Sequence, residues 1–162
     1  MAHLTPQQYA AIKAEITADP VLAAQPMNSD GAYNIAAALN LPASPDFIVW
    51  KTSVTSQEIG NAMNANEVGG LTTANTNRLM VMERYSGGTF SPARADMRAG
   101  FDGVFSGAGG ALTRAALLTL YKRSATRFEK VLATGTGTDA SPATITAESS
   151  VAYNEIEIAR AA

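Results

Sequence analysis

Apolar residues recur at helical spacing near the start of the chain. The segment Thr5–Gln8 is typical of a helix start, because it offers a capping threonine, a proline at the first helical position and a glutamine at the capping-box position. This helix is expected to end at Asp19-Pro20, and a second is expected from Asn28 or Ser29 to about Asn40. Their inward residues are Tyr9, Ile12, Ile16, Ile35, Ala36 and Leu39. The two helices predict a helical hairpin.

The middle of the chain alternates short apolar runs with capping and turn signals. Residues 47–50 form an apolar run that is too short to be assigned to a strand or to a buried helix. A capping box at Thr55–Glu58 predicts a short helix. A further helix is expected from Ala74 to Ser86, with Leu79 and Met82 inward and Gly87 and Gly88 directly after it.

Ser91-Pro92 places a capping residue before proline and predicts another helix start. The apolar face of this helix consists of Met97, Phe101, Val104 and Phe105. Gly100 and Gly103 lie within it, and each costs about 1 kcal/mol relative to alanine in an exposed helix interior. Close packing of another backbone against these glycines would explain them.

The longest apolar stripe predicts one helix from about Ala111 to Ala133. Its members recur at spacings of three and four and include Leu117, Tyr121, Ala125, Phe128 and Leu132. This helix is expected to be the central element of the fold.

The chain after this helix begins with a break at Gly135–Asp139. Weak alternation from Ala143 to Ala147 indicates a strand, and Ser150 is expected to cap a final short helix. The sequence therefore predicts a mainly α fold: a compact helical bundle (1–134) with a long central helix, followed by an extended, partly β C-terminal arm (135–162). The arm is expected to be mobile in the free chain and to become ordered against a neighbour.

Composition narrows the function classes. Charged residues make up 16% of the chain against about a quarter in a typical soluble domain, so small and polar residues must form much of the surface. Such a surface either contacts another protein or faces water. The net charge of −2 argues against non-specific binding of nucleic acid. No segment approaches the roughly 20 apolar residues that span a bilayer, and the start of the chain lacks a signal-peptide pattern.

No motif points to catalysis or to a bound cofactor. The chain has no cysteine, and its one histidine is His3, so a metal site would need carboxylates alone. Gly135-Thr136-Gly137 lacks the lysine and hydroxyl of a phosphate loop, and Ser106 lacks the flanking glycines of a nucleophile elbow. Neither Glu155 with Glu157 nor Asp96 with Asp102 is spaced to share a helix face. The chain is expected not to be an enzyme and to hold no metal or cofactor.

The clearest polar feature is a basic face on the expected central helix, formed by Arg123, Arg127 and Lys130, with Arg114 and Lys122 nearby. One interpretation is a solvated face partly neutralised by Glu129. The other is a surface that docks on an acidic partner or lies near DNA.

Several segments of the chain resemble one family. These are HLTPQQYAAIKAEITADPVLAAQPMNSDGAYNIAAALNLP, PDFIVWKTSV, ADMRAGFDGVF and KRSATRFEKVLATGTGTDASPAT. They are similar to a group of small proteins encoded in the structural gene clusters of tailed bacteriophages. The resemblance covers most of the chain and is weakest from about Ile59 to Gly88.

The resemblance implies a virion protein, made in the bacterial host cytoplasm. The role that it favours is a head-to-tail connector or adaptor in the neck, docked on the portal protein beside neighbouring tail or neck proteins. Proteins of that role form homo-oligomeric rings of about twelve copies, through which DNA can pass. The expected interface residues are Arg114, Lys122, Arg123, Arg127, Lys130, Ile145 and Val151.

Three other functions compete with this one. The chain could be another tail component or minor head component of the virion. It could also be a non-enzymatic binding or regulatory module encoded by a prophage. An enzyme that uses carboxylates alone is least favoured, because acid-base catalysis most often uses histidine.

Overall fold

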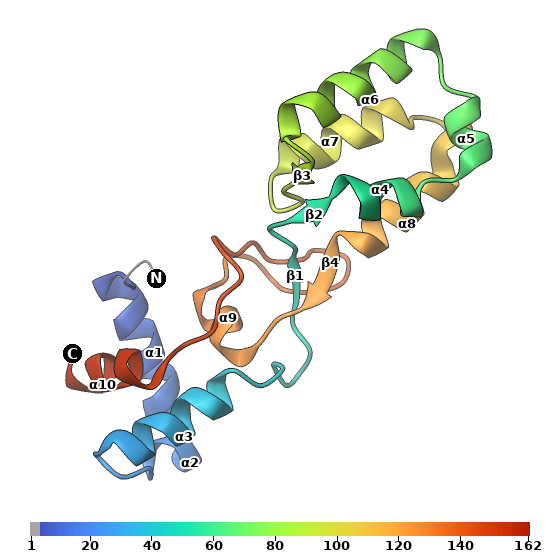
Figure 1. Cartoon of the computed structure of the whole chain (residues 1–162). Helices are drawn as coiled ribbons and strands as arrows, with labels where there is room; N and C mark the ends of the chain where they lie inside the picture. The colour runs from blue at the N-terminus through green and yellow to red at the C-terminus, as the bar shows by residue number, and fades with distance from the viewer. Residues whose placement is uncertain (1–3) are drawn as a thin grey trace. The chain divides into compact units, whose positions relative to one another are not determined.

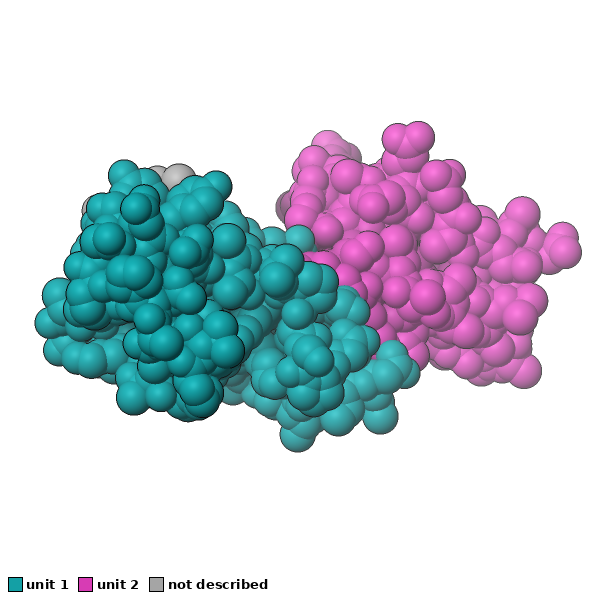
Figure 2. All heavy atoms as spheres, turned by 90° about the horizontal axis from the view of Figure 1, so that it is seen from below, with its two compact units in different colours: residues 1–49, 124–162 teal, residues 50–123 magenta. Residues whose placement is uncertain are grey.

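The computed structural model describes residues 4–162 and is mainly helical (Figure 1). The chain forms two compact units, residues 1–49 with 124–162 (unit 1) and residues 50–123 (unit 2), which Figure 2 colours separately. His3 lies outside the described residues. Two units with separate hydrophobic cores therefore replace the single bundle expected from the apolar stripes.

Unit 1 contains five helices among the described residues. They are α1 (Pro6–Ala18), α2 (Pro20–Ala23), α3 (Ser29–Leu39), α9 (Arg127–Leu132) and α10 (Tyr153–Ala161). Helix α10 packs on both α1 and α3, and α9 also packs on both of them. Their core includes Tyr9, Ile12, Ile16, Leu22, Ile35, Leu39, Phe128, Val151 and Ile156. The two helices of the expected hairpin are therefore joined mainly through α9 and α10, and they do not form a simple pair.

Local sequence sets the ends of the first two helices. The capping box is present: the Thr5 backbone N–H donates to Gln8 Oε1 (2.8 Å), and the Gln8 N–H donates to Thr5 Oγ1 (3.3 Å). Asp19 ends α1, and its carboxylate accepts the Val21 N–H (2.8 Å) at the start of α2. These predictions are confirmed because the donors and acceptors lie within a few residues of one another.

The C-terminal segment packs in unit 1 and is not the separate arm expected for residues 135–162. Ile145, Val151 and Ile156 are buried, and α10 packs against α3. The side chain of Asn40 bonds both backbone groups of Val151: its Nδ2 donates to the carbonyl oxygen, and its Oδ1 accepts the N–H, each at 2.9 Å. The apolar residues of this segment thus have their partners within their own chain.

Smaller features of this segment also differ from expectation. Helix α10 begins at Tyr153, and the Ala152 N–H donates to Glu155 (3.1 Å), so Ser150 is not its cap. The strand expected at 143–147 is replaced by two isolated β-bridges, which pair Ala143 with Val49 and Thr144 with Thr134.

Unit 2 surrounds a second core with helices and one small sheet. Its elements are β2 (Val54–Thr55), α4 (Ser56–Ala62), α5 (Ala65–Gly69), α6 (Thr73–Ser86), β3 (Thr89–Phe90), α7 (Ala95–Val104), the 3-10 turn η1 (Ala108–Gly110) and α8 (Ala111–Leu120). Strands β2 and β3 pair antiparallel. Buried core residues are Val54, Ile59, Phe90, Phe101, Val104, Phe105, Leu117 and Tyr121.

The sequence predicts α4 and α6 well and α7 less well. Thr55 and Glu58 form the expected capping box, and Gly87 ends α6 in the left-handed region (φ 62°). Helix α7 begins at Ala95 and has no side-chain cap, so Ser91-Pro92 marks a turn rather than its start. That turn is closed by a hydrogen bond from the Arg94 N–H to the Ser91 carbonyl oxygen (3.1 Å).

The glycines of α7 admit side chains of α6, not another backbone. A Cβ at Gly100 would lie 2.8 Å from Met82 Cε, and one at Gly103 would lie 2.9 Å from an Arg78 guanidinium nitrogen. Glycine at both positions therefore lets α6 and α7 approach closely.

The single central helix expected from Ala111 to Ala133 is absent. Helix α8 ends at Leu120, strand β4 (Lys122–Ser124) follows, and α9 begins at Arg127. A capping box at Thr126 and Glu129 starts α9: each residue's side chain accepts the other's backbone N–H, at 3.1 Å and 3.0 Å. Strand β4 forms a two-stranded sheet with β1 (Ile48–Trp50), the apolar run whose structure the sequence left open.

Candidate assembly surface

Helix α6 is the most exposed long helix of unit 2 and has no buried residue. Its half-buried residues Asn75, Leu79, Met82 and Ser86 follow one another at helical spacing and form the inner stripe. Leu79 and Met82 pack against the core of unit 2, as the sequence predicted for them. All other apolar residues of α6 are left outside that core.

We call the outward-facing surface of α6 the outer face. It consists of three exposed apolar residues, Met80, Val81 and Tyr85, and of the exposed Arg84. Met80 is 62% exposed, Val81 52% and Tyr85 87%. Val81 and Tyr85 are four residues apart, so they lie one above the other on the same side of the helix. This group of large exposed apolar side chains makes the outer face a candidate site of contact with another molecule.

A groove of about 460 Å³ runs beside the outer face. Val81 and Tyr85 form one wall, and Arg94 and Met97 belong to the other. Arg94 pairs with Asp96 (2.5 Å), and this hydrogen bond is the main reason why the pKa of Asp96 is lowered. The charge of Arg94 is therefore already matched, whereas Arg84 stands exposed in the last turn of α6.

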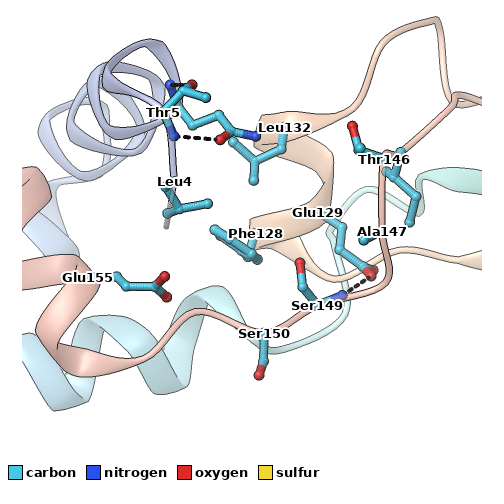
Figure 3. Close-up of a pocket in the computed structure, with 12 residues that line it drawn as sticks. Leu4, Thr5, Phe128, Glu129, Leu132, Thr146, Ala147, Ser149, Ser150 and Glu155 are labelled. Carbon is cyan, nitrogen blue, oxygen red and sulfur yellow. Dashed lines mark hydrogen bonds between the residues drawn. The ribbon is translucent and has the colours of Figure 1, made fainter. Parts of the chain in front are cut away.

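Unit 1 contains a pocket of about 540 Å³, shown in Figure 3 and called the unit 1 pocket below. Its apolar lining consists of Leu4, Phe128, Leu132, Ile145 and Ala147. Hydroxyl and carboxylate groups join them, from Thr5, Thr146, Ser149, Ser150, Glu129 and Glu155. No lysine or arginine is among the described residues that line it.

Two carboxylates give the unit 1 pocket its acidic character. Glu129, 4% exposed, accepts the N–H of Ser149 (3.3 Å), which Figure 3 shows as a dashed line. Glu155 lies on the other side of the Phe128 ring in that view. The pocket lining thus combines apolar side chains with the half-buried carboxylate of Glu155, whereas Glu129 is buried and already accepts two backbone N–H groups.

Charge is divided unequally between the two units. Unit 1 carries four lysines and arginines against nine aspartates and glutamates, a net charge of −5. Unit 2 carries eight against five, a net charge of +3. The near-neutral total of −2 conceals this separation.

The predicted basic face does not lie on a single helix. Arg123 lies in β4, whereas Arg127 and Lys130 lie in α9, so the three do not share one helix. Arg127 binds two carboxylates of unit 1, Glu15 and Asp19, at 2.7 Å each. Its hydrogen bond is the largest cause that lowers the pKa of Asp19. Arg127 therefore stabilises unit 1.

The other predicted interface residues also have roles within the chain. Arg114 donates to the carbonyl oxygens of Phe105 and Gly107, the ammonium group of Lys130 lies 5.8 Å from the centre of the Phe47 ring, and Lys122 is half-buried in β4. Ile145 and Val151 are 4% and 3% exposed, which places both in the interior of unit 1. Ile145 also lines the unit 1 pocket.

The outer face of α6 was missed as a site, although its signal is present in the sequence. Leu79 and Met82 were correctly placed inward, and that placement leaves Met80, Val81 and Tyr85 on other sides of the helix. When a helix has more apolar residues than its buried face can hold, the remaining ones form a second apolar surface that is exposed unless another molecule packs on it.

Two kinds of feature are absent from residues 4–162. No group of three or more histidine, cysteine, aspartate or glutamate side chains is placed to hold a metal ion. None of the helices combines the length and apolar character needed to cross a membrane.

Comparison with protein-family models, with curated proteins and with solved structures finds no match to this chain.

Proposed function

We propose that this chain is a structural virion protein of a tailed phage, a head-to-tail connector that forms a homo-oligomeric ring on the portal protein. The observation that carries the proposal is the outer face of α6. Val81 and Tyr85 lie largely in solvent on a helix that contributes no residue to the buried core of its unit. A surface of this kind serves binding, and the resemblance to phage structural proteins provides the setting.

The division of charge supports assembly of many copies. Oppositely charged surfaces steer subunits toward one another and fix the register in which they dock. In a ring, the positive charge of unit 2 is repeated around the circle, so a chain with a modest net charge presents a strong local field. The same repetition provides a surface past which DNA can move.

The unit 1 pocket favours one second candidate. A non-enzymatic binding module encoded by a prophage would use a concave, mostly apolar site with a few polar groups, which is the usual form of a ligand site. Such a module would act in the infected cell and would not be retained in the particle.

The experiment is mass spectrometry of phage particles purified on a density gradient from a host that carries the gene. We expect the chain in the particles at a copy number similar to that of the portal protein, and electron microscopy should place it in the neck. The abundant capsid protein provides the internal standard. Absence of the chain from intact, infectious particles would refute a virion role and leave the binding module.

The same preparation also tests where in the virion the chain is located. Heads and tails that have not joined can be separated by sedimentation. A connector should accompany the heads, whereas a tail component should accompany the tails. Recovery with the free tails alone would exclude docking on the portal ring.

A further inference from the structure

We propose that copies of this chain assemble through a directional contact in which Tyr85 of one copy enters the unit 1 pocket of the next. In this contact, the partner of the outer face of α6 is a second copy of the same chain. It rests on the ring that the proposed function requires. Each copy offers one outer face and one pocket, so every copy can bind two neighbours.

The first argument is the match of chemistry between side chain and pocket. Tyr85 is 87% exposed and presents an aromatic ring with a hydroxyl at its tip. A tyrosine buries its ring best against apolar groups while the hydroxyl finds a polar partner. The pocket provides both, because it is lined by the apolar side chains of Leu4, Leu132 and Ala147 and by the carboxylate of Glu155. Its volume of about 540 Å³ gives room for the ring.

The second argument is charge. The pocket belongs to the unit with net charge −5, and the outer face belongs to the unit with net charge +3. Arg84 is exposed on the outer face together with Tyr85, so a contact made through this face brings a positive group to the edge of the pocket. The pocket lining offers the carboxylate of the half-buried Glu155, and no lysine or arginine is among the described residues that line it. Opposite charges at the edge of an apolar contact raise the rate of encounter and select the partner.

The geometry of such a contact explains why it suits a ring. A contact between two different surfaces of identical chains is heterologous, so it propagates from copy to copy. It closes into a ring when the rotation between neighbours divides a full turn. A contact of α6 with α6 would instead stop at a dimer, because each surface would be used up.

The contact is tested with the full-length chain in solution by analytical ultracentrifugation at low and high salt. Tyr85→Ser removes the aromatic ring, and Tyr33→Ser is the matched control, since Tyr33 is a 67% exposed tyrosine of unit 1. Ala147→Trp fills the pocket from an exposed position on its lining. Circular dichroism verifies that each variant is folded.

We expect the wild-type chain and Tyr33→Ser to form concentration-dependent oligomers that weaken as salt is raised. Tyr85→Ser and Ala147→Trp should each weaken self-association by at least about tenfold, the size of effect typical of a buried aromatic at an interface. The contact is refuted if the wild-type chain stays monomeric at every concentration, or if Tyr85→Ser associates as tightly as Tyr33→Ser.

Mixing the two defective variants provides the sharper test. Tyr85→Ser retains an intact pocket, and Ala147→Trp retains an intact Tyr85. An equimolar mixture should therefore form a one-to-one heterodimer and nothing larger, because the remaining surfaces are both defective. A mixture that stays monomeric, or that forms large oligomers, would contradict a heterologous contact. Neither result would bear on whether the chain is in the particle, which the virion preparation tests separately.

Discussion

Replacing Ile156 by alanine tests whether the C-terminal helix belongs to the core of unit 1. The side chain of Ile156 is fully buried in the cluster that includes Ile12, Ile35 and Phe128. The change removes three carbon atoms, and at about 0.8 kcal/mol for each buried CH₂ the lost transfer free energy is about 2.4 kcal/mol. The cavity left behind adds to this, so we expect a total loss of about 3 to 4 kcal/mol.

Ile158→Ala is the matched control, because it makes the same chemical change on the same helix at a residue that is 43% exposed. The higher helix propensity of alanine favours both variants equally. We expect Ile158→Ala to change the free energy of unfolding by less than about 1 kcal/mol. The difference between the variants therefore isolates burial.

The assay is urea unfolding followed by far-ultraviolet circular dichroism on the full chain. A lower midpoint at unchanged slope reports a loss of stability. Hydrogen exchange on the free wild-type chain should also be slow at the backbone amides of α10. Equal effects of the two variants, together with fast exchange in α10, would refute the packing argument and restore the mobile arm expected from the sequence.

Three further substitutions test contacts inside unit 1. Asp19→Asn retains the side-chain oxygen that caps α2 but removes the negative charge that binds Arg127. The bond to Arg127 lowers the pKa of Asp19 below its ordinary value of 3.8. The stabilisation from this bond is therefore fully present above pH 3.8 and is lost as the pH falls through the lowered pKa. The variant should be less stable than wild type at pH 7, and thermal melts should show the gap closing in acid; a constant gap would contradict the ion pair as its cause. Gly137→Ala should destabilise the chain by about 1 to 3 kcal/mol in urea titrations. Residue 137 has φ 67°, and a Cβ there would lie 2.1 Å from the Phe47 ring. Gly109→Ala is the control, because its Cβ would meet open space and the substitution should be tolerated. Arg127→Glu places a third carboxylate beside Glu15 and Asp19 and should lower the melting temperature clearly. Lys13→Glu makes the same reversal of charge at an exposed position of α1 and should not lower it. Similar melting temperatures for both variants would show that Arg127 is not a structural residue.

The amino-acid sequence is enough to predict the parts of the fold that depend on neighbouring residues. The capping boxes at Thr5 and Thr55, the proline after Asp19 and the glycine at residue 87 all act within one helical turn. The same property explains the inward residues of α1 and α3, since helical spacing alone places Ile12 and Ile35 on one face of their helices. Such signals need no knowledge of the rest of the chain.

The long stripe was misread because periodicity does not say which core a residue enters. Leu117 and Tyr121 lie in the core of unit 2, whereas Phe128 lies in the core of unit 1. Their spacing imitates a single helix across the break at β4. The capping box at Thr126 and Glu129 was a local signal for a new helix start, and it would have corrected the prediction.

Which polar and apolar residues remain available to a partner depends on tertiary packing and cannot be predicted from local sequence. Arg127 finds Glu15 and Asp19, which are more than a hundred residues away in the chain, so its charge is used internally. Val151 is held by Asn40 across a similar separation. Tyr85 has an ordinary place in the sequence of α6, but it remains exposed because unit 2 covers only the inner stripe of that helix. Contacts between distant residues are set by the packing of whole elements, and this packing also places most of the acidic residues in one unit and most of the basic residues in the other.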